Sequence, residues 1–97
     1  MTHRSLPSTA SVRLFESGTS FIARSEAKHL LRGLERFEEV IVDFADVLEV
    51  GQGFVDELFR VWTRAHPGTS LRPVNMSPGV EAMVVRGLPR PASDGDR

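Results

Sequence analysis

The residues of this chain whose types and spacing suggest chemistry lie between Asp46 and Glu57. The turn Gly51-Gln52-Gly53 precedes an amphipathic stretch, and a helix N-terminus offers unpaired amides and a partial positive charge to an anion. However, Glu49 and Asp56 belong to a group of four acidic residues here that would repel a phosphate. Neither the dinucleotide-binding pattern nor the P-loop pattern is present. A glycine turn that lets the chain enter the helix is therefore the simpler interpretation.

The carboxylates of Asp56 and Glu57 have two interpretations. As hard oxygen ligands they could hold Mg²⁺, or they could act as an acid/base pair. In the first turn of a helix, however, they are favoured by the helix dipole, and they could pair with Arg24 or with Arg60. The second interpretation requires no ligand, and we expect neither a metal site nor a cofactor.

The other candidate residues lack the partners that catalysis needs. His3, His29 and His66 do not show metal-ligand spacing, no serine or threonine has a recognisable base partner, and the chain has no cysteine. We therefore expect no catalytic residue and a non-enzymatic protein.

Composition excludes several functional classes. The 97 residues are 40% hydrophobic and 26% charged, with a formal net charge of -1, which indicates one globular domain and argues against binding driven by charge to nucleic acid or to an anionic membrane. No segment resembles a signal peptide or reaches the ~20 apolar residues of a membrane span. We expect a cytoplasmic protein with no nucleic-acid or membrane partner.

The elements that must position these residues follow from apolar periodicity. Strands are expected at residues 12–15, 21–23, 39–44 and 71–74, and helices at residues 24–37, 53–65 and 78–87. The order is ββαβαβα, an α/β domain with a mixed sheet of about four strands in which the first two strands form a hairpin. Segment 39–44 is apolar on both faces and belongs in the centre, whereas Pro73 places the last strand at an edge. Residues 1–10 and 89–97 are expected to be disordered tails around a domain of residues 11–88.

Right-handed crossover connections make the last three strands parallel, so their carboxyl ends share one edge of the sheet. We expect three helix N-termini and most of the polar candidates to converge there, where they would bind a partner. The predicted partner-binding residues are Arg24, Glu49, Gly51, Gln52, Gly53, Asp56, Glu57, Arg60 and Asn75.

Several spaced motifs carry a family resemblance. The run IVDFADVLEVGQGFVDELFRVW, followed by HP, LRPVN and SPGVEAMV, resembles the STAS domains of anti-sigma factor antagonists. It is closer still to the STAS-like domains of unknown function, in which RSEAK, GQGF and DELFRV stand in comparable places. The resemblance covers roughly residues 12–86. It implies a compact α/β fold and a regulatory role in bacterial signalling through contacts with a protein, such as a histidine-kinase-like ATP-binding kinase or a transcription regulator.

The resemblance also implies a difference at Gln52. STAS antagonists are switched by phosphorylation of a hydroxyl residue in an Asp-Ser-Ser/Thr-Gly turn, and Gln52 occupies the corresponding place without a hydroxyl. We therefore expect the docking surface to carry over and the phosphorylation switch to be absent. Ser25 and Ser77 are more simply helix caps than phosphorylation sites.

Two alternatives remain open at the level of the sequence. One is a sensor of a small molecule or nucleotide that uses the same edge, with or without Mg²⁺. The other is a structural homodimer, suggested by the broad apolar stripe of Phe54, Phe59 and Trp62.

Overall fold

The structure of the chain is a computed structural model, which describes residues 8–88. Most of the two expected tails, residues 1–7 and 89–97, therefore lies outside the described residues. The first strand begins at Thr9. Thr9 and Ala10, which we assigned to the N-terminal tail, thus belong to the folded domain.

The strands form two separate sheets, and every strand pair in them is parallel. The larger sheet has the order β1-β3-β5, built from β1 (Thr9–Arg13), β3 (Glu39–Asp43) and β5 (Ser70–Val74). The smaller sheet pairs β2 (Ser20–Phe21) with β4 (Glu49–Val50). The expected α/β class, the central position of β3 and the edge position of β5 are confirmed.

The single mixed sheet and the hairpin are wrong. The first two strands do not pair with each other, because the 3₁₀ turn η1 (Leu14–Glu16) buries Leu14 and turns the chain away from β1. Gly18 follows with a φ of 144°, and β2 then joins β4 in the second sheet. A glycine between two short apolar runs is a local signal, and it cannot distinguish a hairpin from two strands that pair with distant segments.

Helical segments supply the rest of the domain. They are α1 (Arg24–Leu31), η2 (Leu34–Arg36), α2 (Gln52–Asp56), η3 (Glu57–Val61), α3 (Trp62–Ala65) and α4 (Pro78–Gly87). α2, η3 and α3 follow one another without interruption as one helix, in which η3 is a π-helical segment. None of the helices in residues 8–88 has the length and apolar character that crossing a bilayer requires.

The first helix is shorter than expected and begins differently. It ends at Leu31 because Gly33 takes a left-handed φ of 83°, so the continuation of the helix to residue 37 was wrong. Ser25 does not cap it. Instead, the carboxylate of Glu26 accepts hydrogen bonds from the amides of Ile22 (2.7 Å) and Ala23 (2.9 Å).

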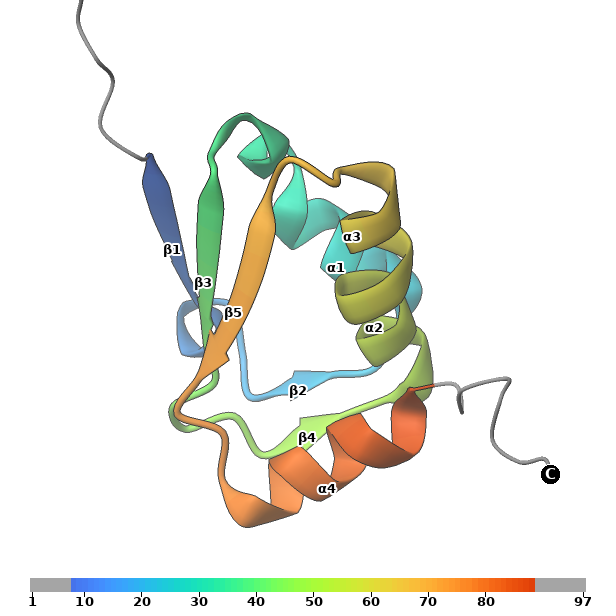
Figure 1. Cartoon of the computed structure of the whole chain (residues 1–97). Helices are drawn as coiled ribbons and strands as arrows, with labels where there is room; N and C mark the ends of the chain where they lie inside the picture. Colours follow the sequence, from blue (N-terminus) through green and yellow to red (C-terminus); the bar gives the residue numbers. More distant parts are fainter. Residues whose placement is uncertain (1–7, 89–97) are drawn as a thin grey trace, which may run out of the picture.

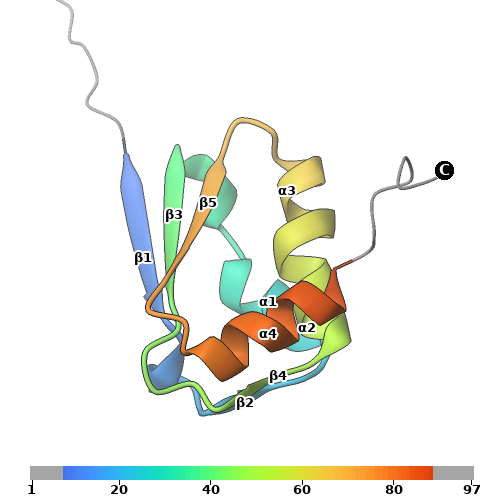
Figure 2. The ribbon, with the colours of Figure 1, turned by 60° about the horizontal axis from the view of Figure 1, so that its bottom comes forward.

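The elements enclose one core. Figure 1 shows the three-stranded sheet facing α1 and the α2–α3 helix, with β2 and β4 below them. α4 packs against β4 and α2, and Figure 2 shows it crossing in front of the lower part of the molecule. Phe44, Phe54, Leu58 and Val80 are fully buried between these elements. This arrangement fixes the start of α1 beside the start of α2.

Candidate functional site

Two arginines and two carboxylates meet where α1 packs against the α2–α3 helix. The Nη1 atom of Arg24 lies 2.9 Å from Asp56 Oδ2 and 3.2 Å from Glu57 Oε1. Arg60 binds Asp56 with two nitrogen atoms, Nε at 2.5 Å and Nη2 at 2.8 Å. We call these four residues the arginine–carboxylate network. The expected pairing of the carboxylates with Arg24 and Arg60 is confirmed. Their expected place in the first turn of the helix was wrong, because α2 begins at Gln52 and its first turn contains no acidic residue.

Asp56 and Glu57 are buried, although both are acidic. Their side chains are 12% and 6% exposed, against 45% for Arg24 and 39% for Arg60. Hydrogen bonds from Arg60, and then from Arg24, lower the pKa of Asp56 from 3.8 to about 2, although its burial acts in the opposite direction. The guanidinium groups thus neutralise the buried carboxylates, while the arginine side chains themselves stay partly exposed to solvent.

The π-helical segment η3 supports this arrangement. A π-helical turn leaves backbone carbonyls without their normal α-helical donors, and such turns occur frequently at functional sites. Here the hydroxyl of Thr63 donates to the carbonyl oxygens of Phe59 (2.8 Å) and Arg60 (3.2 Å). The irregular turn is therefore compensated locally, and it carries both Glu57 and Arg60.

The glycine turn lies against the segment between β2 and α1. A methyl group on Gly51 would meet Ile22 Cγ2 at 2.8 Å and Ile22 Cα and O at 3.0 Å, and one on Gly53 would meet the Arg24 nitrogen at 3.2 Å. The amide of Gly51 donates to the Phe21 carbonyl (2.8 Å), and that of Phe54 donates to the Ile22 carbonyl (3.1 Å). These amides join two parts of the chain, which weakens the phosphate-cradle interpretation further.

Gln52 and Glu49 lie on the exposed surface beside this contact. Gln52 is the first residue of α2 and is exposed. Glu49 in β4 is exposed too, and its carboxylate accepts a hydrogen bond of 3.1 Å from the hydroxyl of Ser20 in β2. The predicted residues from 49 to 60, together with Arg24, are therefore brought together by the β2–β4 pair and the two helix starts.

Asn75 does not join this group. It follows β5, has a left-handed φ of 60° and donates a hydrogen bond of 3.0 Å to Asp43 at the end of β3. It lines a separate open hollow of about 540 Å³ with Asp46 and the start of α4. The expected convergence of three helix N-termini was wrong, because β2 and β4 form their own sheet and lead away from the ends of β3 and β5 (Figure 1).

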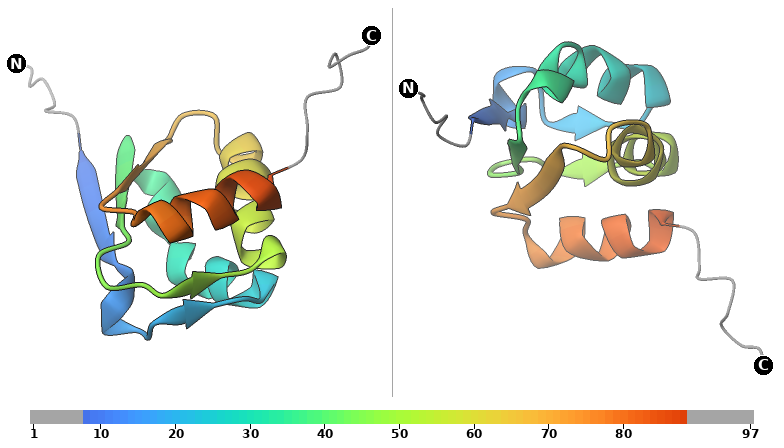
Figure 3. Two further views of the ribbon diagram at one scale, coloured as in Figure 1. Left: turned by 90° about the horizontal axis from the view of Figure 1, so that it is seen from below. Right: turned by 45° about the horizontal axis from the view of Figure 1, so that its top comes forward.

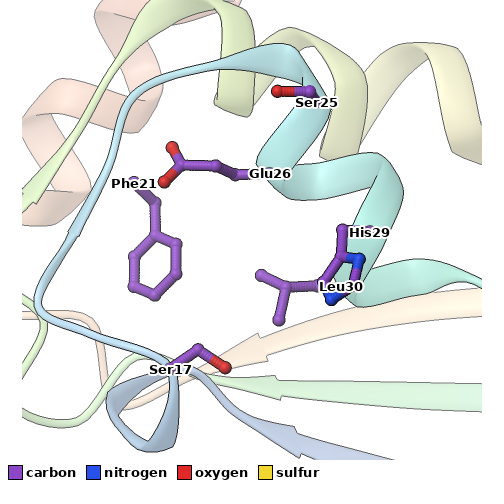
Figure 4. Close-up of a pocket in the computed structure, with 6 residues that line it drawn as sticks. All are labelled: Ser17, Phe21, Ser25, Glu26, His29 and Leu30. Carbon is purple, nitrogen blue, oxygen red and sulfur yellow. The ribbon is translucent and has the colours of Figure 1, made fainter.

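Sequence reasoning did not identify a hollow beside the first turn of α1. It has a volume of about 330 Å³; Phe21 and Leu30 form its apolar part, while Ser25, Glu26 and His29 form a polar side with Ser17 (Figure 4). Ser25 and His29 are four residues apart on one helix, which is a usable signal. Ser17 comes from another element and has no such signal.

Within residues 8–88 there is no group of three or more histidine, aspartate and glutamate side chains that could hold a metal ion. Asp56 and Glu57 are instead engaged by the two arginines. The carboxylate pair therefore gives no support to the Mg²⁺ alternative.

Comparison with models of protein families shows the family to which the chain is related. The family model described as a STAS-like domain of unknown function matches residues 26–81, more than half of the chain. The chain belongs to this STAS-like family. The matched segment of the STAS-like domain includes the glycine turn and three members of the arginine–carboxylate network, whereas Arg24 lies just before it. No curated protein and no solved structure was found to match the chain.

Proposed function

We propose that this STAS-like domain is a non-enzymatic regulatory module that docks a protein partner at the junction of α1 and α2. The docking surface consists of Arg24, Gln52 and Arg60, with Glu49 at its margin and Gly51 and Gly53 beneath. The observation that supports it best is the arginine–carboxylate network, which holds two half-exposed guanidinium groups in place on buried carboxylates.

Fixed arginines favour binding for a physical reason. Ordering a long side chain at an interface costs about 0.5–1.5 kcal/mol of conformational entropy, and Arg24 and Arg60 are already held by their carboxylates in the free protein. Arginine is enriched at interfaces because its planar group binds carboxylates and stacks on aromatic rings. A partner that offers acidic or aromatic groups would fit these two residues.

The docking surface has no phosphorylation switch at the turn. Gln52 stands exposed at the start of α2, in the place where STAS antagonists carry a hydroxyl residue. A phosphate would add a charge of about -2 beside two buried carboxylates, whereas Gln52 stays neutral. Docking is thus constitutive at this position, and the family resemblance points to a histidine-kinase-like ATP-binding protein or a transcription regulator as the partner.

Quantitative capture from a lysate of the native cell tests the proposal. Gln52→Glu places a negative charge on the docking surface, where it repels the acidic groups of a partner, without touching the core. Ser70→Glu is the matched control, since Ser70 is exposed at the start of β5 and the substitution adds the same charge. We expect one protein to be captured by the wild type and by Ser70→Glu but lost with Gln52→Glu. The same captured proteins with all three baits would contradict the proposal.

A small-molecule sensor is the second candidate, favoured by the hollow beside α1. Its volume of about 330 Å³ is within the range of ligand pockets, and it combines an apolar part with hydroxyl and imidazole groups. Its lining residues include the acidic Glu26 but no arginine or lysine. A neutral or cationic small molecule fits it better than a nucleotide.

A thermal-shift panel of metabolites separates the two candidates. A ligand at a hundred times its dissociation constant adds about 2.7 kcal/mol to the stability of the folded state. For a sensor, that shift should disappear in His29→Ala, which alters the hollow, and persist in Lys28→Ala one residue earlier on the exposed surface. The absence of any shift across the panel would remove the sensor and leave the docking proposal untouched.

A further inference from the structure

Along its outer edge, β1 presents backbone hydrogen-bonding groups to solvent. The carbonyl of Ser8 accepts from the amides of Glu38 and Glu39, both at 3.1 Å, so the backbone groups of Ser8 and of every second residue after it point to β3. Those of Thr9, Ser11 and Arg13 point outward. Within residues 8–88, no backbone hydrogen bond outside the sheets uses the amides of these three residues.

The opposite edge of the same sheet, formed by β5, is protected against pairing with a further strand. The amide of Ser70 donates to the Glu38 carbonyl (2.9 Å), and the Val74 carbonyl accepts from Phe44 (2.9 Å), so Leu71 and Pro73 are the residues of β5 that point outward. Proline has no amide hydrogen, and natural proteins use it to protect exposed strand edges. β1 has no proline and no bulge, and Figures 1 and 3 show it as the outermost strand.

We propose that β1 pairs with β1 of a second copy of the chain, antiparallel and centred on Ser11. In this register Ser11 donates to Ser11 of the second copy and accepts from it, and the amide of Arg13 donates to the Thr9 carbonyl on each side. The Arg13 carbonyl is already used, since Arg13 is the N-cap of η1. The result is one sheet with three strands from each copy.

The charges on the exposed face of the sheet suit this register. Thr9 is aligned with Glu39, and Arg13 with Asp43, across the β1–β3 pair. In this register Arg13 has its own Asp43 on one side and the neutral Thr9 of the second copy on the other, and Glu39 of the second copy follows one strand further, bound by Arg72. No like charges face each other directly across β1, and like charges there would be destabilising.

Apolar cover and closure favour the same arrangement. Ala10 and Val12 point toward the core side but are only half-buried at the edge, and a second β1 would cover them further. The two-fold axis makes the contact identical on both sides. The outer edges of the joined sheet are then the two β5 strands with Pro73, which stop further growth. This surface is distinct from the docking surface at α1 and α2.

Cysteine cross-linking tests the register in the full chain, which contains no cysteine of its own. Ser11→Cys places two thiols opposite each other, where paired Cα atoms are about 5.5 Å apart. Thr9→Cys is the matched control on the same strand, because its two copies would be offset by about 14 Å along the strands. We expect a short bismaleimide to link Ser11→Cys at least about tenfold faster than Thr9→Cys, and a mixture of Thr9→Cys and Arg13→Cys to form a linked heterodimer.

Sedimentation gives an independent readout. The wild type should show a concentration-dependent dimer that Ser11→Pro abolishes, because proline removes the outward amide hydrogen of residue 11 while the amides that pair with β3 remain, whereas Ser11→Thr should retain the dimer. Equal cross-linking rates for Ser11→Cys and Thr9→Cys would overturn the register. A wild-type chain that stays monomeric at every concentration would overturn the proposal itself.

Discussion

At the scale of single residues, Asp56 is the carboxylate of the candidate site that both arginines bind. It accepts hydrogen bonds from Arg60 and Arg24, which lower its pKa to about 2. The folded state therefore holds this proton less tightly than the unfolded chain, in which the pKa is near 3.8. The stabilisation from the ionised carboxylate is complete above the higher value and is lost as the pH falls toward the lower one.

We predict that the urea midpoint of the wild type falls between about pH 5 and pH 2 more steeply than that of Asp56→Asn. The variant lacks the titrating group, so its own midpoint should be lower at neutral pH but change less over this interval. Asp43 also has a lowered pKa, caused first by its hydrogen bond with Asn75. It is present in both proteins, and its contribution cancels. Parallel pH profiles would contradict the role assigned to Asp56.

Gly51 provides the second prediction at this scale. A methyl group there would meet the side chain and the backbone of Ile22 at 2.8–3.0 Å, so Gly51→Ala should lower stability by about 1–3 kcal/mol through overpacking. Gly79→Ala is the control, because no atom lies within 4 Å of its added methyl group and it is in α4. That substitution should raise stability by about 0.4–1 kcal/mol. Urea unfolding measures the stability of both variants. A Gly51→Ala variant that is as stable as the wild type would contradict the close contact with Ile22.

At the scale of secondary-structure elements, the starts of α1 and α4 differ in how they are capped. Ser77 accepts a hydrogen bond of 3.1 Å from the Val80 amide, whereas Ser25 caps nothing and Glu26 takes that role in α1. We predict that Ser77→Ala costs about 1 kcal/mol, as loss of an N-cap does, while Ser25→Ala changes stability by less than about 0.5 kcal/mol. Thermal unfolding of the two variants checks this, and an equal loss in both would contradict it.

The sequence predicted those elements that have a local signal. The apolar run of β3, the Ser77-Pro78 start of α4 and the end of α3 before Pro67 all depend on neighbouring residues, and all three are confirmed. β4 has only two residues, with no period of its own, and it was missed. The hairpin was wrong because partner choice between strands is set by the whole chain.

In the candidate site too, features with a local signal were predicted and features set by the whole chain were not. The pairing of Asp56 with Arg60 follows from helical spacing, and its pairing with Arg24 from the expected contact between helix starts. Asn75 was placed with them only because one continuous sheet was assumed, and the second sheet separates it. The burial of Asp56 could not be predicted, because it depends on the packing of α1 against α2 and on Arg24 and Arg60, which lie over its carboxylate.

At the scale of the whole molecule, the two sheets share one core. Phe21 of β2 packs on Phe54 of α2 with ring centroids 5.3 Å apart, and Phe44, next to β3, stacks on Phe59 at 6.4 Å. The stripe that suggested a homodimer is therefore turned inward: Phe54 and Trp62 are buried and Phe59 is partly buried. That stripe no longer supports association.

A shared core predicts that the domain unfolds as one unit and that a destabilising substitution in the core lowers the stability of the whole domain. Leu58 lies in η3, which packs against α1, and is 1% exposed, so Leu58→Ala should cost about 2–5 kcal/mol. Leu48→Ala is the matched control, because Leu48 is 71% exposed and the change should stay within about 0.5 kcal/mol. Since a domain of this kind is stabilised by only about 5–15 kcal/mol in total, the first variant should lose a large part of its stability.

Fluorescence of Trp62, the sole tryptophan, reports on α3, while far-ultraviolet circular dichroism reports on all helices. The two transitions should coincide in the wild type and in both variants, and a separate early transition in either signal would show that α3 and the other helices do not depend on the same core.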